Sequence, residues 1–235
     1  MSFLKAEWRK LAIANYAIDP AVIQKYIPHK TELDLWNNTC YVSLVGFMFK
    51  NTKVLGLKVP FHIDFEEVNL RFYVKYFENN TWKRGVVFIK ELVPKSALSF
   101  VANALYDEHY QTVPMNHKWE LIDENIKVKY HWKYNNNEQK ISILAENKLH
   151  EILPNSETEF ITEHYWGYTK VNENKTFEYE VTHPKWQTYN VKEYDINVDF
   201  GLVYGADFAF LNNLKPNSVM LAEGSEITVE NKKTI

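Results

Sequence analysis

One short stretch of the chain, residues 67–75, alternates polar and apolar side chains in a pattern that could support chemistry. An extended strand would place its polar side chains on one face. These are Glu67, Asn69, Arg71, Tyr73 and Lys75. Arg71 would offer a planar fork of donors to a carboxylate ligand, and Glu67 could move protons or exclude misplaced substrate by its charge. This face either meets water, as in an ordinary half-exposed sheet, or lines a cavity inside a barrel.

Two lysines in and after the next apolar run could supply a reactive amine. Lys95 precedes a predicted helix with Ser96 as its N-cap, and the positive end of a helix disfavours an ammonium ion, which is one route to a nucleophilic amine. Lys90 has the same strand parity as Val86 and Phe88, so it could also face a core or a cavity. The alternative is that both lysines extend from a strand end into water.

An aromatic stretch, residues 160–168, could form the wall of a pocket or could be ordinary core. Its members His164 and Trp166 are candidate ligand contacts. The histidines of the chain lack the spacing of a helical zinc pair, so no metal site is expected. Cys40 is the only cysteine and lies in an apolar run, which predicts a buried structural thiol. Because no phosphate-cradling loop or dinucleotide motif is present, no cofactor is expected.

The segments that must position these residues predict a mainly β fold. Most apolar runs alternate with period two and are rich in β-branched and aromatic residues. The eleven expected strands are residues 8–18, 40–49, 66–76, 85–93, 119–122, 126–134, 141–150, 160–170, 176–181, 188–198 and 219–229. Short polar loops join them, which favours an antiparallel barrel or strongly curved sheet over a parallel α/β fold.

Two helices are expected between the strands. Residues 19–27 begin with an N-cap aspartate, Asp19, followed by Pro20 at the first helical position. Residues 96–110 carry apolar side chains at helical spacing, so one face would pack on the sheet. No linker or internal repeat divides the chain, which predicts a single domain over residues 1–235.

Charge and composition exclude several classes of protein. The 235 residues carry a formal charge of −3 with acidic and basic residues interleaved, so the sequence lacks the clustered basic residues expected of a nucleic-acid-binding protein. No basic amphipathic helix or apolar run of about 20 residues predicts contact with a membrane. A single cysteine and an early charged N-terminus indicate a cytoplasmic protein.

Several motifs resemble the uncharacterised bacterial family catalogued as domain of unknown function 2071. The matching stretches are residues 32–36, 41–47, 65–74 (FEEVNLRFYV, the most specific), 84–88, 163–168, 183–186 and 222–225. The resemblance implies an acetoacetate decarboxylase-like fold, a cone-shaped antiparallel β barrel around a central cavity. It therefore favours the cavity interpretation of the face that carries Glu67 and Arg71.

The same resemblance bears on the lysines. Pro94-Lys95-Ser96 is similar to the Pro-Lys-Lys stretch that supplies the Schiff-base lysine of the decarboxylase, and Glu67 resembles one of its cavity glutamates. Ser96 stands where the activating lysine would be, so decarboxylase activity is not carried over and Lys90 stays a rival to Lys95.

Two main hypotheses of function remain open. In the first, the barrel acts on a small oxo-acid or carbonyl metabolite through a Schiff base on Lys95 or Lys90, as a cofactor-free lyase, with Arg71 holding the carboxylate. In the second, it is a lipocalin-like binder of an apolar or aromatic ligand without catalysis. A filled barrel without a pocket is a third, weaker alternative, and a homodimer through strand edges is open.

Overall fold

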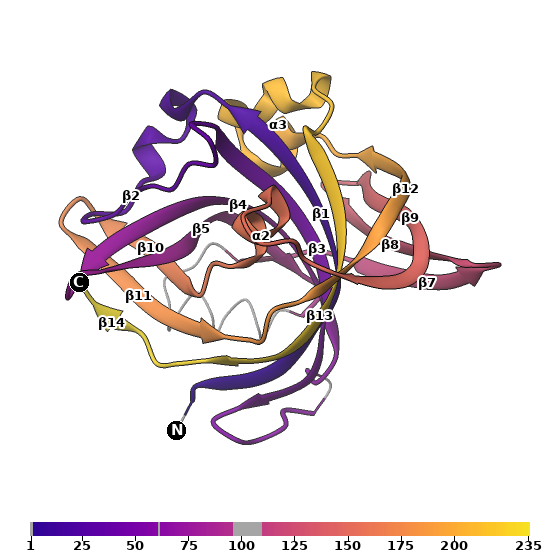
Figure 1. Ribbon diagram of the computed structural model, residues 1–235, viewed down its shortest axis with the longest axis horizontal. Coiled ribbons are helices and arrows are strands. Elements are labelled where there is room, and N and C mark those ends of the chain that lie inside the picture. The colour runs from indigo at the N-terminus through magenta and orange to yellow at the C-terminus, as the bar shows by residue number, and fades with distance from the viewer. Residues whose placement is uncertain (1, 61, 96–109) are drawn as a thin grey trace.

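The computed structural model describes residues 2–60, 62–95 and 110–235, and its strands form one 14-stranded sheet (Figure 1). The strands are β1 Leu4–Ile18, β2 Glu32–Leu33, β3 Cys40–Val54, β4 Phe65–Glu78, β5 Thr81–Val93, β6 Tyr110–Thr112, β7 Met115–Ile122, β8 Asn125–Tyr134, β9 Asn137–Glu151, β10 Trp166–Asn172, β11 Lys175–Thr182, β12 Gln187–Asn197, β13 Ser218–Val229 and β14 Lys233–Thr234. The predicted mainly β fold is confirmed.

Seven of the strands close into a ring. Their order is β11–β10–β5–β4–β3–β1–β13, and β13 pairs back onto β11 through Val181–Val229 and Thr182–Thr228. All neighbours in the ring are antiparallel except β5 and β10, which pair in parallel over two residue pairs. The sheet therefore curls around an enclosed interior, which agrees with the barrel expected from the alternating strands.

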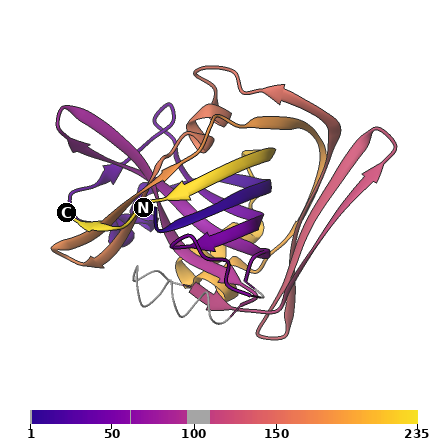
Figure 2. The same ribbon diagram turned by 90° about the horizontal axis from the view of Figure 1, so that it is seen from below.

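The remaining long strands form a wing on one side of the ring. From β13 the sheet continues through β12, β9 and β8 to β7, and Figures 1 and 2 both show these strands standing beside the ring. The fold therefore has two apolar cores. An inner core fills part of the ring, and an outer core lies between the outside of β1, β3, β4 and β5 and the wing.

Short helices connect the strands. They are the 3-10 turns η1 Pro20–Val22, η2 Gln24–Tyr26 and η3 Ala206–Asn213, and the α-helices α2 Glu157–Thr162 and α3 Phe200–Tyr204. The Asp19 side chain caps η1 as predicted, by accepting a hydrogen bond from the Ala21 N–H at 2.9 Å. The predicted helix over residues 96–110 lies outside the described residues except for Tyr110, which begins β6.

The strand predicted over residues 160–170 is wrong in its first half. There α2 ends at Thr162, and β10 begins only at Trp166. Ser156 starts the helix as its N-cap, with its side chain accepting from the Glu159 N–H at 3.1 Å, and Glu157 and Glu159 suit the positive helix end. Capping thus outweighs the β-favouring side chains that follow.

A β-bulge in β5 changes which residues of this strand face the ring interior. Leu70 of β4 pairs with Lys90, but the next residue, Arg71, pairs with Phe88, so Ile89 is the extra residue. A bulge reverses the side-chain parity beyond it. The prediction that Lys90 shares a face with Phe88 is therefore wrong, because Phe88 points inward and Lys90 points to the outer core.

Two glycines permit close contacts within the ring. A Cβ on Gly85 would lie 2.5 Å from the Trp166 carbonyl oxygen, at the joint between β5 and β10. Gly224 of β13 has φ +80°, and a Cβ there would lie 2.0 Å from the carbonyl oxygen of Trp8. Larger residues at these positions would push neighbouring strands apart.

Candidate functional site

The ring encloses a cavity of about 150 Å³. Each of the seven ring strands contributes at least one described lining residue. Ten of its 24 described lining residues are aromatic: Phe3, Trp8, Phe47, Phe49, Phe65, Phe88, Tyr110, Trp166, Tyr179 and Trp186. A cavity of this kind excludes the alternative of a filled barrel without a pocket.

The polar side chains of β4 lie inside this cavity. Glu67, Asn69 and Arg71 line it and are each at least nine-tenths buried. The Asn69 amide donates to a carboxylate oxygen of Glu67 at 2.9 Å, and the Tyr110 hydroxyl donates to the other Glu67 oxygen at 3.2 Å. The apolar side chains of the same strand, such as Leu70, point to the outer core. Both faces of β4 are buried, so its polar face does not meet bulk water.

Arg71 carries a cation into this interior with few partners. Its side chain is 7% exposed, one terminal nitrogen donates to the Ile161 carbonyl at 3.3 Å, and the guanidinium lies 5.6 Å from the Tyr73 ring centre. Its Nε has no hydrogen-bond partner, and no described carboxylate forms an ion pair with it. A guanidinium has five N–H donors, so most of its binding capacity is available to a ligand.

His164 is held at the cavity wall by a carboxylate behind it. Its Nε2 lies 3.1 Å from an oxygen of Asp34, and the Arg84 Nε lies 2.6 Å from the same oxygen. Burial lowers the pKa of His164 to about 4, against the opposing effect of the hydrogen bond to Asp34. Burial works to raise the pKa of Asp34, but its hydrogen bonds with His164 and Arg84 outweigh burial and lower it. Near neutral pH the site therefore holds a neutral imidazole beside an ionised carboxylate.

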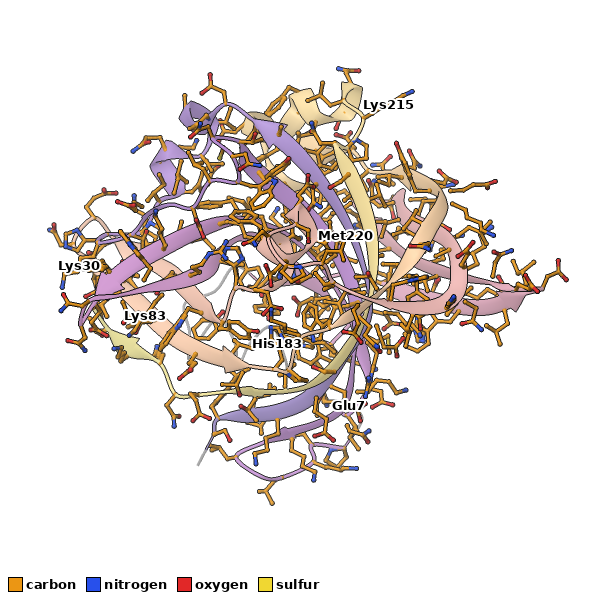
Figure 3. All side chains as sticks on the ribbon, in the orientation of Figure 1. Glu7, Lys30, Lys83, His183, Lys215 and Met220 are labelled. Carbon is orange, nitrogen blue, oxygen red and sulfur yellow. The ribbon has the colours of Figure 1, made fainter. Side chains whose placement is uncertain are left out.

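A second histidine, His183, lies between the cavity and an outer groove that it also lines. Its ring stacks on Trp186 at 4.3 Å between centres and lies 4.7 Å from the Tyr165 ring. Its Nδ1 lies 2.9 Å from the Pro184 carbonyl, and burial lowers its pKa. Figure 3 shows His183 within the outline of the ring.

The other predicted site residues occupy different positions. Trp166 lines the cavity, with the Lys83 ammonium 4.2 Å from its ring centre. Tyr73 lies behind the wall, where its hydroxyl is 2.7 Å from Ser43 Oγ and its ring is 4.7 Å from His164. Tyr73 therefore supports His164 and Arg71 from outside the lining.

Neither candidate lysine is among the described lining residues. Lys90 donates to the Val203 carbonyl and, at 3.1 Å, to the Tyr134 hydroxyl, both in the outer core. Lys95 is partly exposed two residues after the end of β5. The structure thus brings Glu67, Asn69, Arg71, His164 and Trp166 together at one cavity and leaves both lysines off its described wall.

Sequence reasoning missed several residues that build the site. They are Trp8, Asp34, Arg84, Glu91, Tyr110, Thr162, Tyr179, His183 and Trp186. The motifs at residues 32–36 and 183–186 contain Asp34, His183 and Trp186. These motifs supported the family resemblance, but the types and spacing of their residues did not indicate a role in a site. Pairing partners far apart in sequence, such as Asp34 and His164, carry no local pattern.

The part of the chain that the structure describes contains neither a metal-site candidate nor a membrane-spanning helix. Within the described residues, no group of three His, Cys, Asp or Glu side chains could hold a metal ion. The same part of the chain contains no helix long and apolar enough to cross a membrane. Cys40 is buried, and burial raises the pKa of its thiol to about 11, so it has no feature of a nucleophile.

Comparison with solved structures shows the fold. Acetoacetate decarboxylase from Legionella pneumophila superimposes with a TM-score of 0.66 and 13% identity, covering 99% of this chain and 86% of that one. The enduracididine biosynthesis enzyme MppR complexed with pyruvate gives a TM-score of 0.70 and 10% identity, covering 100% of this chain and 91% of that one. An acetoacetate decarboxylase-like enzyme from Sphingomonas wittichii gives a TM-score of 0.68 and 8% identity, covering 100% of this chain and 93% of that one.

Sequence comparison shows the family. The uncharacterized protein YqjF of Bacillus subtilis is 31% identical over 74 residues, which span about a third of each chain (31% of both). The model of the domain of unknown function 2071, described as an uncharacterized conserved protein, matches residues 5–226. This chain therefore belongs to the domain of unknown function 2071 family and has the acetoacetate decarboxylase-like fold.

Proposed function

We propose that this protein binds a small carboxylic acid inside the ring, with Arg71 as the anchor for the carboxylate. The observation that carries the proposal is the buried guanidinium of Arg71, whose Nε has no partner and which forms no ion pair with a described carboxylate. Burying a charge without a counterion is costly, so a site that keeps one is suited to an anionic ligand. A carboxylate would accept two parallel hydrogen bonds from the guanidinium.

The size of the cavity limits the ligand. A cavity of about 150 Å³ matches one known to hold a molecule of benzene, which has about six non-hydrogen atoms. An acid of three or four carbons has this size. The pyruvate complex of MppR, which shares the fold, supports a ligand of this kind. The aromatic wall would exclude water around the acid and so strengthen its attraction to Arg71.

The test compares binding of a three-carbon 2-oxo acid to the wild-type protein and to two arginine variants. Arg71→Met keeps most of the side-chain volume and removes the charge. Arg9→Met is the matched control, because Arg9 pairs with Glu7 and does not line the cavity. We expect Arg71→Met to weaken binding at least about 30-fold, as for loss of a charged hydrogen-bonded pair, and Arg9→Met to leave it unchanged. Equal affinity of wild type and Arg71→Met in calorimetry would refute the proposal.

A covalent version of this function places a Schiff base on Lys95. It is favoured by the position of Lys95 two residues after Val93, whose side chain belongs to the inner core. The uncharged amine would attack the ligand carbonyl carbon, a C–N bond would form, and the carbonyl oxygen would leave as water to give an iminium. Glu67 would then be placed to move protons.

Borohydride reduction followed by intact-mass spectrometry tests the covalent version. Incubation with the 2-oxo acid should give an adduct that maps to Lys95 and disappears in Lys95→Ala. Lys90→Ala is the control, because Lys90 points to the outer core. An unmodified mass under reducing conditions, with binding still present, would leave the protein as a non-covalent binder.

A further inference from the structure

The hydrogen bonding of His164 fixes which of its nitrogens carries the proton. An ionised Asp34 can only accept hydrogen bonds, and its oxygen lies 3.1 Å from His164 Nε2. The Nε2 atom must therefore donate. In a neutral imidazole only one nitrogen carries hydrogen, so Nδ1 holds a lone pair. Arg84, 2.6 Å from the same Asp34 oxygen, keeps the carboxylate ionised and so maintains this tautomer.

The acceptor nitrogen of His164 is buried and has no partner. The side chain is 1% exposed, the ring lines the cavity, and Nδ1 forms no hydrogen bond within the described part of the chain. Asp34 is not a lining residue. Nδ1 therefore lies on the ring edge that Asp34 does not occupy. A buried acceptor left unpaired destabilises the protein, so a ligand donor there would be favoured.

We propose that His164 selects ligands with a hydroxyl group, so that the natural ligand of the cavity is a small hydroxycarboxylic acid. This inference rests on the proposed carboxylate binding, since Arg71 must first hold the carboxylate, and it is an alternative to the Schiff base, because a hydroxy acid offers Lys95 no carbonyl carbon to attack. The hydroxyl would donate its hydrogen to His164 Nδ1. Acids without that hydrogen keep the Arg71 contact but leave Nδ1 unpaired.

Asp34 and Tyr73 are positioning residues in this arrangement. Asp34 sets the tautomer of His164, and Tyr73 packs 4.7 Å from its ring and holds its own place through Ser43 at 2.7 Å. Asn69 offers a second unpartnered acceptor, Oδ1, to the same cavity. An Asn amide also has donors and can rotate to suit a ligand, so it discriminates less sharply than an imidazole whose tautomer is fixed.

The test uses three acids of nearly equal size: propionate, pyruvate and lactate. They differ only in whether carbon 2 carries hydrogens, an oxo group or a hydroxyl. We expect wild-type protein to bind lactate about tenfold more tightly than the other two, the effect of one well-placed hydrogen bond of roughly 1.4 kcal/mol. His164→Phe should abolish the preference while propionate binding persists. His117→Phe, which changes a histidine that does not line the cavity, should retain it.

A second measurement uses only the wild-type protein, so its result does not depend on whether the variants fold. With ¹⁵N-labelled histidine, lactate should move the His164 Nδ1 resonance upfield, as an acceptor nitrogen does when it gains a hydrogen bond, and propionate should not. Equal binding of all three acids with no shift at Nδ1 would overturn the hydroxyl selection and leave the carboxylate proposal standing. Failure of every acid to bind would overturn both.

Discussion

The two faces of the β4–β5 pair differ in what their buried cations contact. On the outer face, Lys90 donates to the Val203 carbonyl and the Tyr134 hydroxyl, among tightly packed apolar side chains. On the inner face, Arg71 has one carbonyl partner and an unpaired Nε, at a cavity. The same two strands therefore carry a hydrogen-bonded cation on the outer side and an under-paired cation at a cavity on the inner side.

This difference separates stability from binding within one strand. Residues that point outward are expected to contribute to folding and not to ligand affinity. Residues that point inward are expected to do the opposite, because a site that keeps unpaired groups for a ligand gives up some stability. Mutations at adjacent positions of β4 and β5 can thus test the division.

The largest expected effect is on the outer face, from Phe72→Ala. Phe72 is fully buried in the outer core, so its loss should reduce the free energy of unfolding by about 3–5 kcal/mol. Phe88→Ala is the matched inner variant and should cost less, because Phe88 already borders a cavity. Denaturant unfolding of both proteins measures the difference. Equal losses would break the proposed division between the faces.

The next effect is a pH dependence that originates on the inner face. His164 has a pKa of about 4 in the folded protein, whereas a histidine in the unfolded chain has a pKa of about 6.5. Between these two pH values the unfolded state therefore binds more protons than the folded state. Stability should therefore fall as pH decreases through this window, by on the order of 3 kcal/mol from this group. The charged groups that face it are Asp34, Arg84 and Arg71. His164→Phe should flatten the slope in urea unfolding between pH 6.5 and 4.5, and an unchanged slope would assign it elsewhere.

The smallest effects are expected from removing the charge of each buried cation, Lys90 or Arg71. Lys90→Met should lower the free energy of unfolding by about 1–2 kcal/mol, because the Val203 carbonyl loses a charged donor. Arg71→Met should leave the ligand-free protein equally stable or up to about 1 kcal/mol more stable, because it removes an under-paired buried charge. Thermal melts without ligand measure both. A larger loss for Arg71→Met than for Lys90→Met would contradict the comparison.

Much of the fold could be predicted from the sequence, because period-two alternation is a local property. The alternation of β4 placed Glu67, Asn69 and Arg71 on one face, and that face does line a cavity. The bulge at Ile89 could not be predicted, since an apolar residue in an apolar strand gives no sign of an extra position. It alone moved Lys90 to the other core.

The missing half of the site depends on contacts between distant segments. Asp34 and His164 are 130 positions apart and meet because β2 pairs with β4 and β10 pairs with β5. A lone aspartate and a lone histidine have no spacing rule that links them. Their pairing follows from ring closure, which a single sequence does not reveal.

The pairing of β1 has a consequence for synthesis of the protein. One edge of β1 pairs with β3, which follows soon in the chain, but its other edge pairs with β13, in contacts such as Leu4–Val229. At roughly 5–20 residues per second, the ribosome needs at least about ten seconds to make the chain between these partners. During that interval the free edge of β1 is open to pairing with other chains. Nascent chains of this protein should therefore depend on chaperones that cover extended apolar segments until β13 emerges.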